Sequence, residues 1–135
     1  MDTATQTAPE RPIYGRAYVE IAADLALPIP AKFRRTKKMG GTTLTFAPWY
    51  VYTRILNYYA PGWSKRVVVT PIGGQLVVTV AISIPCAEGV VTREATGIED
   101  DSVKGFGDTA SNAESMAFRR ACAQFGLGLH FYEDK

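Results

Sequence analysis

Two consecutive arginines near the C-terminus, Arg119 and Arg120, have the residue type and spacing that point most directly to chemistry. They fall in a segment of helical periodicity, where an exposed arginine commonly has an acidic partner three or four positions away. Here those positions hold uncharged residues: Ser115, Met116, Ala117, Cys122, Ala123 and Gln124. Because a guanidinium can direct two N–H donors at phosphate oxygens, the pair suits phosphate binding. Ion pairing with the acidic stretch 99–101, or with another subunit, is the alternative.

Other basic residues gather in short segments, although the formal net charge is only +2. The further candidates for contact with a nucleic-acid backbone are Lys65, Arg66, Arg34, Arg35, Lys37 and Lys38. The last four lie in a predicted hairpin, where lysines on an exposed strand also serve to block edge-to-edge association of sheets. That structural role is the favoured one for the hairpin on its residues alone. Since acidic residues collect elsewhere, a local basic surface is compatible with the low net charge.

Aromatic residues form another group with two explanations. Four tyrosines cluster between residues 50 and 59: Tyr50, Tyr52, Tyr58 and Tyr59. Such side chains stack on nucleobases in single-strand-binding proteins. More often they belong to the core or to a subunit interface.

Enzymatic patterns are weaker. Acidic residues that could bind magnesium in a nuclease are Glu99, Asp100, Asp101 and Asp108, but contiguous acids in a Gly-rich stretch are usually only solvated. The Gly105-Phe106-Gly107 stretch lacks the third glycine of a dinucleotide loop. Cys86 and Cys122 form no CxxC pair and His130 is alone, so all three are expected to be structural. We therefore predict a protein that is not an enzyme and requires neither ATP nor metal.

The elements that must hold the N-terminal basic residues follow from prolines, glycines and apolar spacing. Residues 16–27 have the pattern of a short helix that Pro28 and Pro30 end. A hairpin is predicted for residues 32–38 and 42–46, because the glycine pair of Met39-Gly40-Gly41 supplies the positive φ of its turn. A second helix begins with Pro48 as its first residue and stops at Pro61-Gly62.

The C-terminal half predicts a sheet followed by the helix that carries the arginine pair. Strands are expected at 63–70, 76–84 and 90–96, with a turn at Gly73-Gly74 and a loop over 97–108. The final helix is capped by Asp108, or by Ser111 with Glu114, and stops at Gly126. Its stripe of small residues, which allows close packing on a sheet or helix, comprises Ala110, Ala113, Ala117 and Ala121.

This order of elements predicts an α+β domain with a mostly antiparallel sheet. With 135 residues, the chain fits one domain over 13–135 behind a polar, flexible leader of residues 1–12. The leader lacks the apolar region of a signal peptide, and no run approaches the length of a membrane span. We expect a soluble protein of the cytoplasm, associated with the nucleoid if the source is bacterial.

The segment from Ala117 to Tyr132 resembles the signature of the Rad-fifty-two superfamily of single-strand annealing proteins. In that family a basic pair on a helix is followed by an FG-IG or FG-LG turn and an aromatic tail, as in Phe125-Gly126-Leu127-Gly128 and the residues after it. The resemblance extends over residues 23–132 and is greatest to the bacterial DNA-damage-response branch. It covers nearly all of the predicted domain.

This resemblance implies helices packed on a curved antiparallel sheet with a β-hairpin, assembly into a ring, and DNA held in a basic groove. Arg119 and Arg120 match the family's basic pair, and Lys104 resembles the lysine before that helix. Arg54 lies about one turn from the position of a further basic residue of the family. The chain departs from the larger members at Ala123, where they carry a third basic residue.

The function expected from residues and resemblance together is binding of single-stranded DNA and annealing of complementary strands in DNA repair or recombination. The expected partners are single-stranded DNA, further copies of the chain in a homo-oligomeric ring, and other repair or recombination proteins, with no membrane. Two other classes stay open. One is a double-stranded-RNA-binding module, and the other is a small metal-dependent nuclease that uses the acidic loop.

Overall fold

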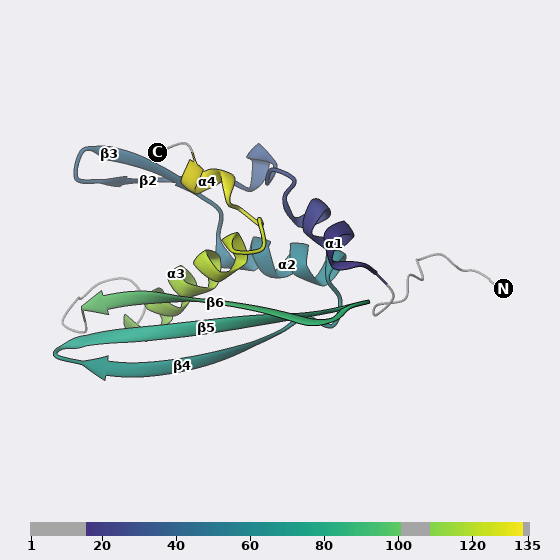
Figure 1. Ribbon diagram of the computed structural model, residues 1–135. Coiled ribbons are helices and arrows are strands. Elements are labelled where there is room, and N and C mark those ends of the chain that lie inside the picture. The colour runs from purple at the N-terminus through teal and green to yellow at the C-terminus, as the bar shows by residue number, and fades with distance from the viewer. Residues whose placement is uncertain (1–15, 101–108, 134–135) are drawn as a thin grey trace.

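The computed structural model describes residues 16–100 and 109–133 (Figure 1). Its elements are α1 (Tyr18–Leu25), the short 3-10 helix η2 (Ala31–Phe33), β2 (Arg35–Met39), β3 (Thr42–Phe46), α2 (Trp49–Tyr59), β4 (Ser64–Ile72), β5 (Gln75–Cys86), β6 (Gly89–Asp100), α3 (Thr109–Ala123) and α4 (His130–Glu133). Strands β2 and β3 form a two-stranded antiparallel sheet, and β4, β5 and β6 form a three-stranded one in that order. The α+β class and the predicted order of helix, hairpin, helix, three strands and helix are confirmed.

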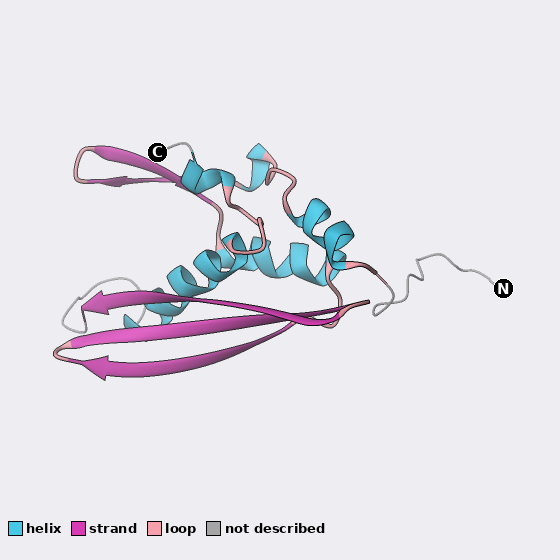
Figure 2. Cartoon of the chain, viewed as in Figure 1, coloured by secondary structure: helices cyan, strands magenta, loops and turns pink. Residues whose placement is uncertain are grey.

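The three-stranded sheet is built around β5, whose residues alternate between two environments. Val78, Val80, Ile82 and Ile84 are fully buried, whereas the residues between them are only partly so. This period of two is that of a strand with one face on the core. The helices lie on one side of the curved sheet (Figure 2), so the even-numbered β5 residues face the helices and the odd-numbered ones face outward.

Helix α3 packs closely on β5 and β6 because it presents small side chains to them. Ala113, Ala117 and Ala121 are completely buried, which confirms most of the predicted stripe. Opposite them lies Gly97 of β6, where an added Cβ would stand 2.3 Å from the Ala113 carbonyl oxygen. Helix and strand therefore approach to a distance that no larger residue at position 97 permits.

Helices α1 and α2 complete the core on the same side of the sheet. Ile21 and Leu25 of α1, and Tyr52 and Leu56 of α2, are at most 1% exposed. The ring of Tyr52 packs edge-on against Phe118 of α3 with centroids 6.3 Å apart. The Tyr52–Phe118 contact ties α2 to α3, and α1 belongs to the same buried cluster, so the arginine pair lies on a helix that is anchored in the core.

Two hairpins project in the same direction, with their turns at the left of the view (Figure 1). The turn between β2 and β3 contains Gly40 and Gly41 with φ of 53° and 82°, and that between β4 and β5 contains Gly73 and Gly74 with φ of 54° and 81°. Two consecutive positive φ angles suit a tight hairpin turn that matches the strand twist. Both predicted turns are confirmed.

The structure corrects the predicted bounds of several elements. Strand β6 continues through residues 97–100, which were expected to be a loop, because these residues pair with 75–78 of β5. The first hairpin strand begins at Arg35 rather than at Lys32, since residues 31–33 form the 3-10 helix. Pro48 is the N-cap of α2 and not its first residue. Ser111 lies inside α3, so it does not cap that helix.

Other predictions fall outside the described residues: the leader 1–12, Asp108 as a cap, and the loop over 101–108. Of the predicted structural residues, Cys86 and Cys122 are buried and unpaired, as expected. His130 accepts a hydrogen bond from the backbone N–H of Ile29 at 3.1 Å, so it links α4 to the segment after α1. None of the helices in the described ranges has the length and apolar character required to cross a membrane.

Candidate nucleic-acid interface

The two arginines of α3 point into different hollows of the surface. Arg119 lines a cleft between α3, α4 and the β2–β3 hairpin, which we call the hairpin cleft. Arg120 lines a second hollow beside the open edge of β6, which we call the edge cavity. Consecutive helical residues point about 100° apart, so this divergence follows from helix geometry.

The hairpin cleft has a volume of about 260 Å³ and walls of mixed chemistry. It is lined by Lys37, Leu44, Thr45, Phe46, Tyr52, Met116, Arg119, Phe131 and Tyr132. Strand register explains why Lys37 faces it, because Lys37 pairs with Leu44, and residues directly opposite in a sheet share one face. The cleft therefore combines two cations with an aromatic wall, which is the composition of a site for a polyanion that carries rings.

The Arg119 guanidinium keeps its hydrogen-bonding capacity in this cleft. It lies over the Phe46 ring, with Cζ 5.8 Å from the centroid. Within residues 16–100 and 109–133 it forms no hydrogen bond and no ion pair. A cation–π contact supplies no hydrogen-bond acceptor to the guanidinium N–H groups, so Arg119 is oriented but still able to bind phosphate.

Arg120 is more exposed than Arg119, and one of its N–H groups is hydrogen-bonded to the sheet. Its Nη1 donates to the carbonyl oxygen of Thr96 on the edge strand β6 at 3.0 Å. The edge cavity around it has a volume of about 570 Å³ and is lined by Ala95, Thr96, Arg120, Ala123, Gln124, Leu129 and Tyr132. The predicted alternative of an ion pair within the subunit finds no support in the described part of the chain, where neither arginine forms one.

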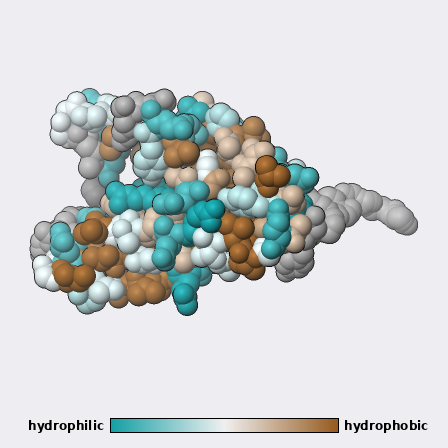
Figure 3. Space-filling model, viewed as in Figure 1, coloured by the Kyte–Doolittle hydropathy of each residue, from teal (hydrophilic) through white to brown (hydrophobic). Residues whose placement is uncertain are grey.

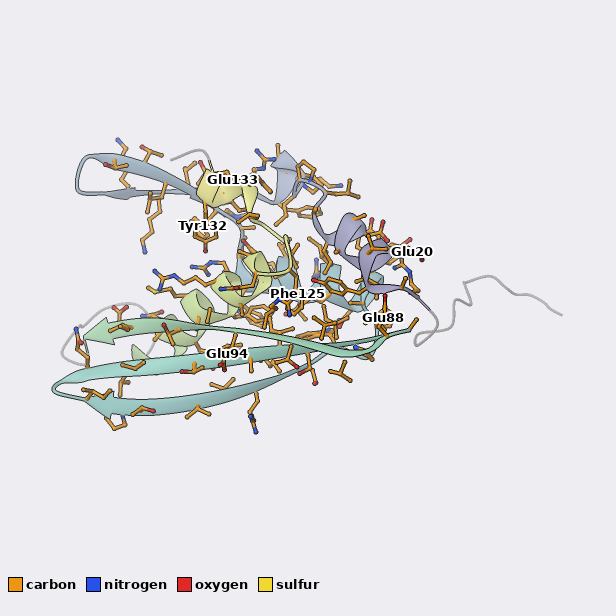
Figure 4. The ribbon with its side chains drawn as sticks, viewed as in Figure 1. Glu20, Glu88, Glu94, Phe125, Tyr132 and Glu133 are labelled. Carbon is orange, nitrogen blue, oxygen red and sulfur yellow. The ribbon has the colours of Figure 1, made fainter. Side chains whose placement is uncertain are left out.

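Tyr132 of α4 is shared by the hairpin cleft and the edge cavity. Figure 4 shows its side chain extending from α4 toward α3, and it lines both hollows. Burial raises the pKa of the Tyr132 hydroxyl, while the charges of Arg119 and Arg120 act in the opposite direction. Both arginines are thus close enough to influence one phenol, which remains protonated at neutral pH.

Two further groups near Arg119 are buried and neutral. Burial raises the pKa of the Tyr52 hydroxyl and of the Cys122 thiol well above their ordinary values, although the positive charge of Arg119 opposes both shifts. Neither group supplies a negative charge to neutralise Arg119. At neutral pH the Tyr52 hydroxyl and the Cys122 thiol therefore leave the charge of the Arg119 guanidinium uncompensated.

The predicted pair Lys65 and Arg66 is split between two faces of the sheet. Lys65 pairs with Ile82 and faces α3, where its Nζ forms an ion pair with Glu114 at 3.0 Å and lies 4.8 Å from the Phe118 centroid. Arg66 pairs with Ala81 and faces outward on the opposite side of the sheet. The structure brings neither residue into the hairpin cleft.

The remaining basic residues surround the cleft at different positions. Arg34 donates to the Ile29 carbonyl at 2.8 Å and lies over the Phe131 ring, so it helps to hold α4 in place. Arg35 and Lys38 are exposed on β2. Arg54 is exposed on α2 and lies over the Tyr50 ring. Lys104 lies outside the described residues.

Of the four tyrosines considered for base stacking, Tyr52 belongs to the core and lines the cleft with its edge. Tyr50 and Tyr58 are exposed, and Tyr58 contacts Tyr59 edge-on. The described residues include no group of His, Cys, Asp and Glu that is arranged to hold a metal ion. Glu99 of the predicted acidic loop lies in strand β6 instead.

The sequence did not indicate a site role for three aromatic residues of the cleft: Phe46, Phe131 and Tyr132. Phe131 and Tyr132 belong to the aromatic tail of the family signature, but the sequence did not indicate what these two side chains contact. Phe46 ends a predicted strand and gave no indication that it would support Arg119, which is 73 residues further along the chain. The cleft joins the β2–β3 hairpin and α2 to the C-terminal helices α3 and α4, which are distant from them in sequence, so spacing alone does not reveal it.

Comparison with curated proteins finds two relatives from Arabidopsis thaliana. The chain is 37% identical over 136 residues to DNA repair RAD52-like protein 1, mitochondrial, and the alignment covers 97% of this chain and 77% of the relative. It is 36% identical over 124 residues to DNA repair RAD52-like protein 2, chloroplastic, and that alignment covers 88% of this chain and 62% of the relative. No protein-family model matches the chain. The identity and coverage of the first relative show that this chain belongs to the family of RAD52-like DNA repair proteins.

Proposed function

We propose that the protein binds single-stranded DNA through the hairpin cleft and anneals complementary strands in DNA repair and recombination. The observation that carries the proposal is the Arg119 guanidinium, which is oriented by Phe46 in a cleft that also holds Lys37 and has no hydrogen bond in the described structure. Such a group is ready to bind a phosphate. Membership of a DNA repair family supports DNA as the source of that phosphate.

Annealing requires that one strand is held by its backbone while its bases remain able to pair. Lysine and arginine contacts to phosphate achieve this without reading sequence. The exposed basic residues along β2, Arg35 and Lys38, extend the positive surface beyond the cleft. The chemistry requires no bond to be made or broken, so we propose a non-catalytic protein that acts without ATP or metal.

We further propose that copies of the chain assemble into a ring, so that the clefts form a continuous track. The outer face of the three-stranded sheet offers an apolar surface for such contacts. Val68, Ile72 and Ile98 are 52%, 58% and 45% exposed there, and Figure 3 shows hydrophobic residues at the turn end of this sheet. A contiguous apolar patch on a soluble chain is typical of an interaction surface. Repetition would also turn a net charge of +2 per chain into a highly charged assembly.

The resemblance to the bacterial DNA-damage-response branch favours a role in the repair of damaged chromosomes. In such a role the protein would act in the cytoplasm, on or near the nucleoid, and would meet other repair or recombination proteins there. This proposed repair role depends on the hairpin cleft, because the protein must bind the single strands that are exposed at the damage.

The experiment that tests the proposal combines an annealing assay with a mass measurement. Two complementary oligonucleotides are mixed without ATP, and duplex formation is followed with and without protein while light scattering gives the mass of the assembly. Annealing by an oligomer supports the proposal. A monomer that neither binds nor anneals single strands in dilute buffer would overturn it.

Variants link the activity to the cleft. Arg119→Glu together with Arg120→Glu should abolish binding while the oligomer remains folded. A charge-matched comparison uses two double variants. The first is Arg119→Gln with Arg120→Gln. The second, Val19→Glu with Ala23→Glu, lowers the net charge by the same amount on the exposed face of α1. Only the arginine variants should lose affinity. Equal loss in both would indicate that overall charge, rather than the cleft, drives binding.

The same assay separates the two other functional classes. Competition with duplex RNA tests the RNA-binding module, which would prefer an A-form duplex to a single strand. Incubation of labelled DNA with magnesium tests the nuclease, which would give cleavage products. We expect preference for single strands and intact DNA.

A further inference from the structure

Tyr132 is a lining residue of both hollows that hold the arginines of α3. Its side chain lines the hairpin cleft with Arg119 and the edge cavity with Arg120. It is 41% exposed although it is a large aromatic residue. A DNA backbone that runs from one hollow to the other would therefore pass next to this side chain.

The Tyr132 hydroxyl is available for a ligand. It forms no hydrogen bond within residues 16–100 and 109–133, although the phenol is partly withdrawn from water. Because burial raises its pKa, the group is a proton donor throughout the neutral range. A phosphate oxygen is an acceptor that such a donor prefers over water, particularly when cations flank it.

The backbone around Tyr132 fixes its position. The backbone N–H of Tyr132 donates to the Leu129 carbonyl oxygen at 2.8 Å, and the backbone N–H of Phe131 donates to the Gly128 carbonyl oxygen at 3.1 Å. Gly128 has a φ of 75°, and an added Cβ there would stand 2.7 Å from the Tyr52 ring. The turn before α4 is thus packed against the core, and it presents Tyr132 toward α3.

We propose that Tyr132 is a DNA-binding residue whose hydroxyl donates a hydrogen bond to the phosphate held by Arg119, while its ring supports the backbone between Arg119 and Arg120. This inference rests on the proposed function, since it names a further contact of the same cleft. It extends the basic pair to a three-residue site in which one donor is neutral.

The test is Tyr132→Phe, which removes the hydroxyl and keeps the ring. Affinity for a single-stranded homopolymer, measured by fluorescence anisotropy, should fall about tenfold, because a hydrogen bond to a charged group is lost. The slope of log affinity against log salt should not change, since no charge is removed. The matched control is Tyr18→Phe on α1, outside both hollows, and it should bind like the wild type. Thermal unfolding of each variant checks that the fold is intact.

A double-mutant cycle tests whether the two residues hold the same phosphate. In the Arg119→Gln background, Tyr132→Phe should cost less than about threefold, because the phosphate is no longer fixed beside the hydroxyl. A full tenfold loss in that background would overturn the shared contact. Wild-type affinity of Tyr132→Phe, together with loss of binding by the arginine variants, would overturn the inference and leave the proposed function intact. Absence of binding by the wild type would overturn both.

Discussion

Gly97 of β6 lies against the backbone of Ala113 on α3 so closely that an ideal Cβ would stand 2.3 Å from the Ala113 carbonyl oxygen and 2.9 Å from the Ala117 nitrogen. Backbone atoms cannot rotate away as a side chain can. The contact therefore sets the distance between the helix that carries the arginine pair and the sheet beneath it.

Gly97→Ala should destabilise the protein for this reason. Overpacking of a filled core costs about 1–3 kcal/mol, so the midpoint of urea unfolding should fall accordingly. The neighbouring Thr96→Ala changes a side chain on the outer face and should cost much less. Equal midpoints for Gly97→Ala and the wild type would mean that α3 can move outward without loss.

Glu114→Gln should strengthen binding of single strands. The variant removes a negative charge from α3, the helix that carries Arg119, together with the partly exposed ion pair that Glu114 forms with Lys65 at 3.0 Å outside the hairpin cleft. The loss in stability should stay below about 1 kcal/mol, because exposed ion pairs contribute little. Anisotropy titrations at low salt give the affinity, and a decrease would show that the ion pair orders the interface.

The salt dependence of binding should separate cleft residues from those on the outer face. Each lost phosphate contact to a single strand reduces the slope of log affinity against log salt by about 0.7. We expect this reduction for Arg119→Gln and Lys37→Gln. Arg66→Gln changes a residue on the opposite face of the sheet and should leave the slope unchanged. A reduced slope for Arg66→Gln would put the outer face on the DNA path.

Stability should decrease at alkaline pH because weakly acidic groups, Cys122 and Tyr52 among them, are buried in the neutral form. The ordinary pKa values are 9.0 for Cys122 and 10.0 for Tyr52, and burial raises the pKa of both in the folded state. Above pH 9.0 the unfolded chain therefore loses protons that the folded chain retains, so the free energy of unfolding falls. The loss should be roughly 1 kcal/mol per pH unit for each group.

Urea unfolding between pH 7 and 11 in the presence of a reductant measures this effect. Cys122→Ala removes one of two buried thiols whose pKa is raised, the other being Cys86, so the decrease between pH 9 and pH 10 should be smaller than in the wild type. An identical decrease over this interval in the variant and the wild type would assign the loss to other groups.

Elements with strong local signals were predictable from the sequence. The alternation along β5 marked Val78, Val80, Ile82 and Ile84 as core residues, because a strand with one buried face requires that period. The glycine pairs identified both hairpin turns through their backbone freedom. The small-residue stripe on α3 predicted close packing before the partner surface was known.

Features that depend on contacts between distant segments were not predictable. Gly97 and the acidic residues after it have the composition of a loop, yet the tight contact with α3 and pairing with β5 hold them in a strand. The sequence near Lys65 contains no indication of its ion pair, because the partner, Glu114, is 49 residues away. The role proposed for Tyr132 depends on its position in both hollows, which only the folded structure shows. In each case the local sequence lacks the partner that decides the outcome.

The two-stranded sheet of β2 and β3 pairs with no other strand in the described structure. A lone hairpin is only marginally stable by itself, whereas α3 on the other side of the cleft is fixed against the larger sheet. One wall of the cleft, with Arg119, therefore belongs to the helix packed on the core, and the opposite wall, with Lys37, belongs to the separate two-stranded sheet. If the cleft binds DNA as proposed, movement of the hairpin would let it accept irregular spacing of phosphates, abasic positions or bulky lesions in a strand while Arg119 keeps its contact.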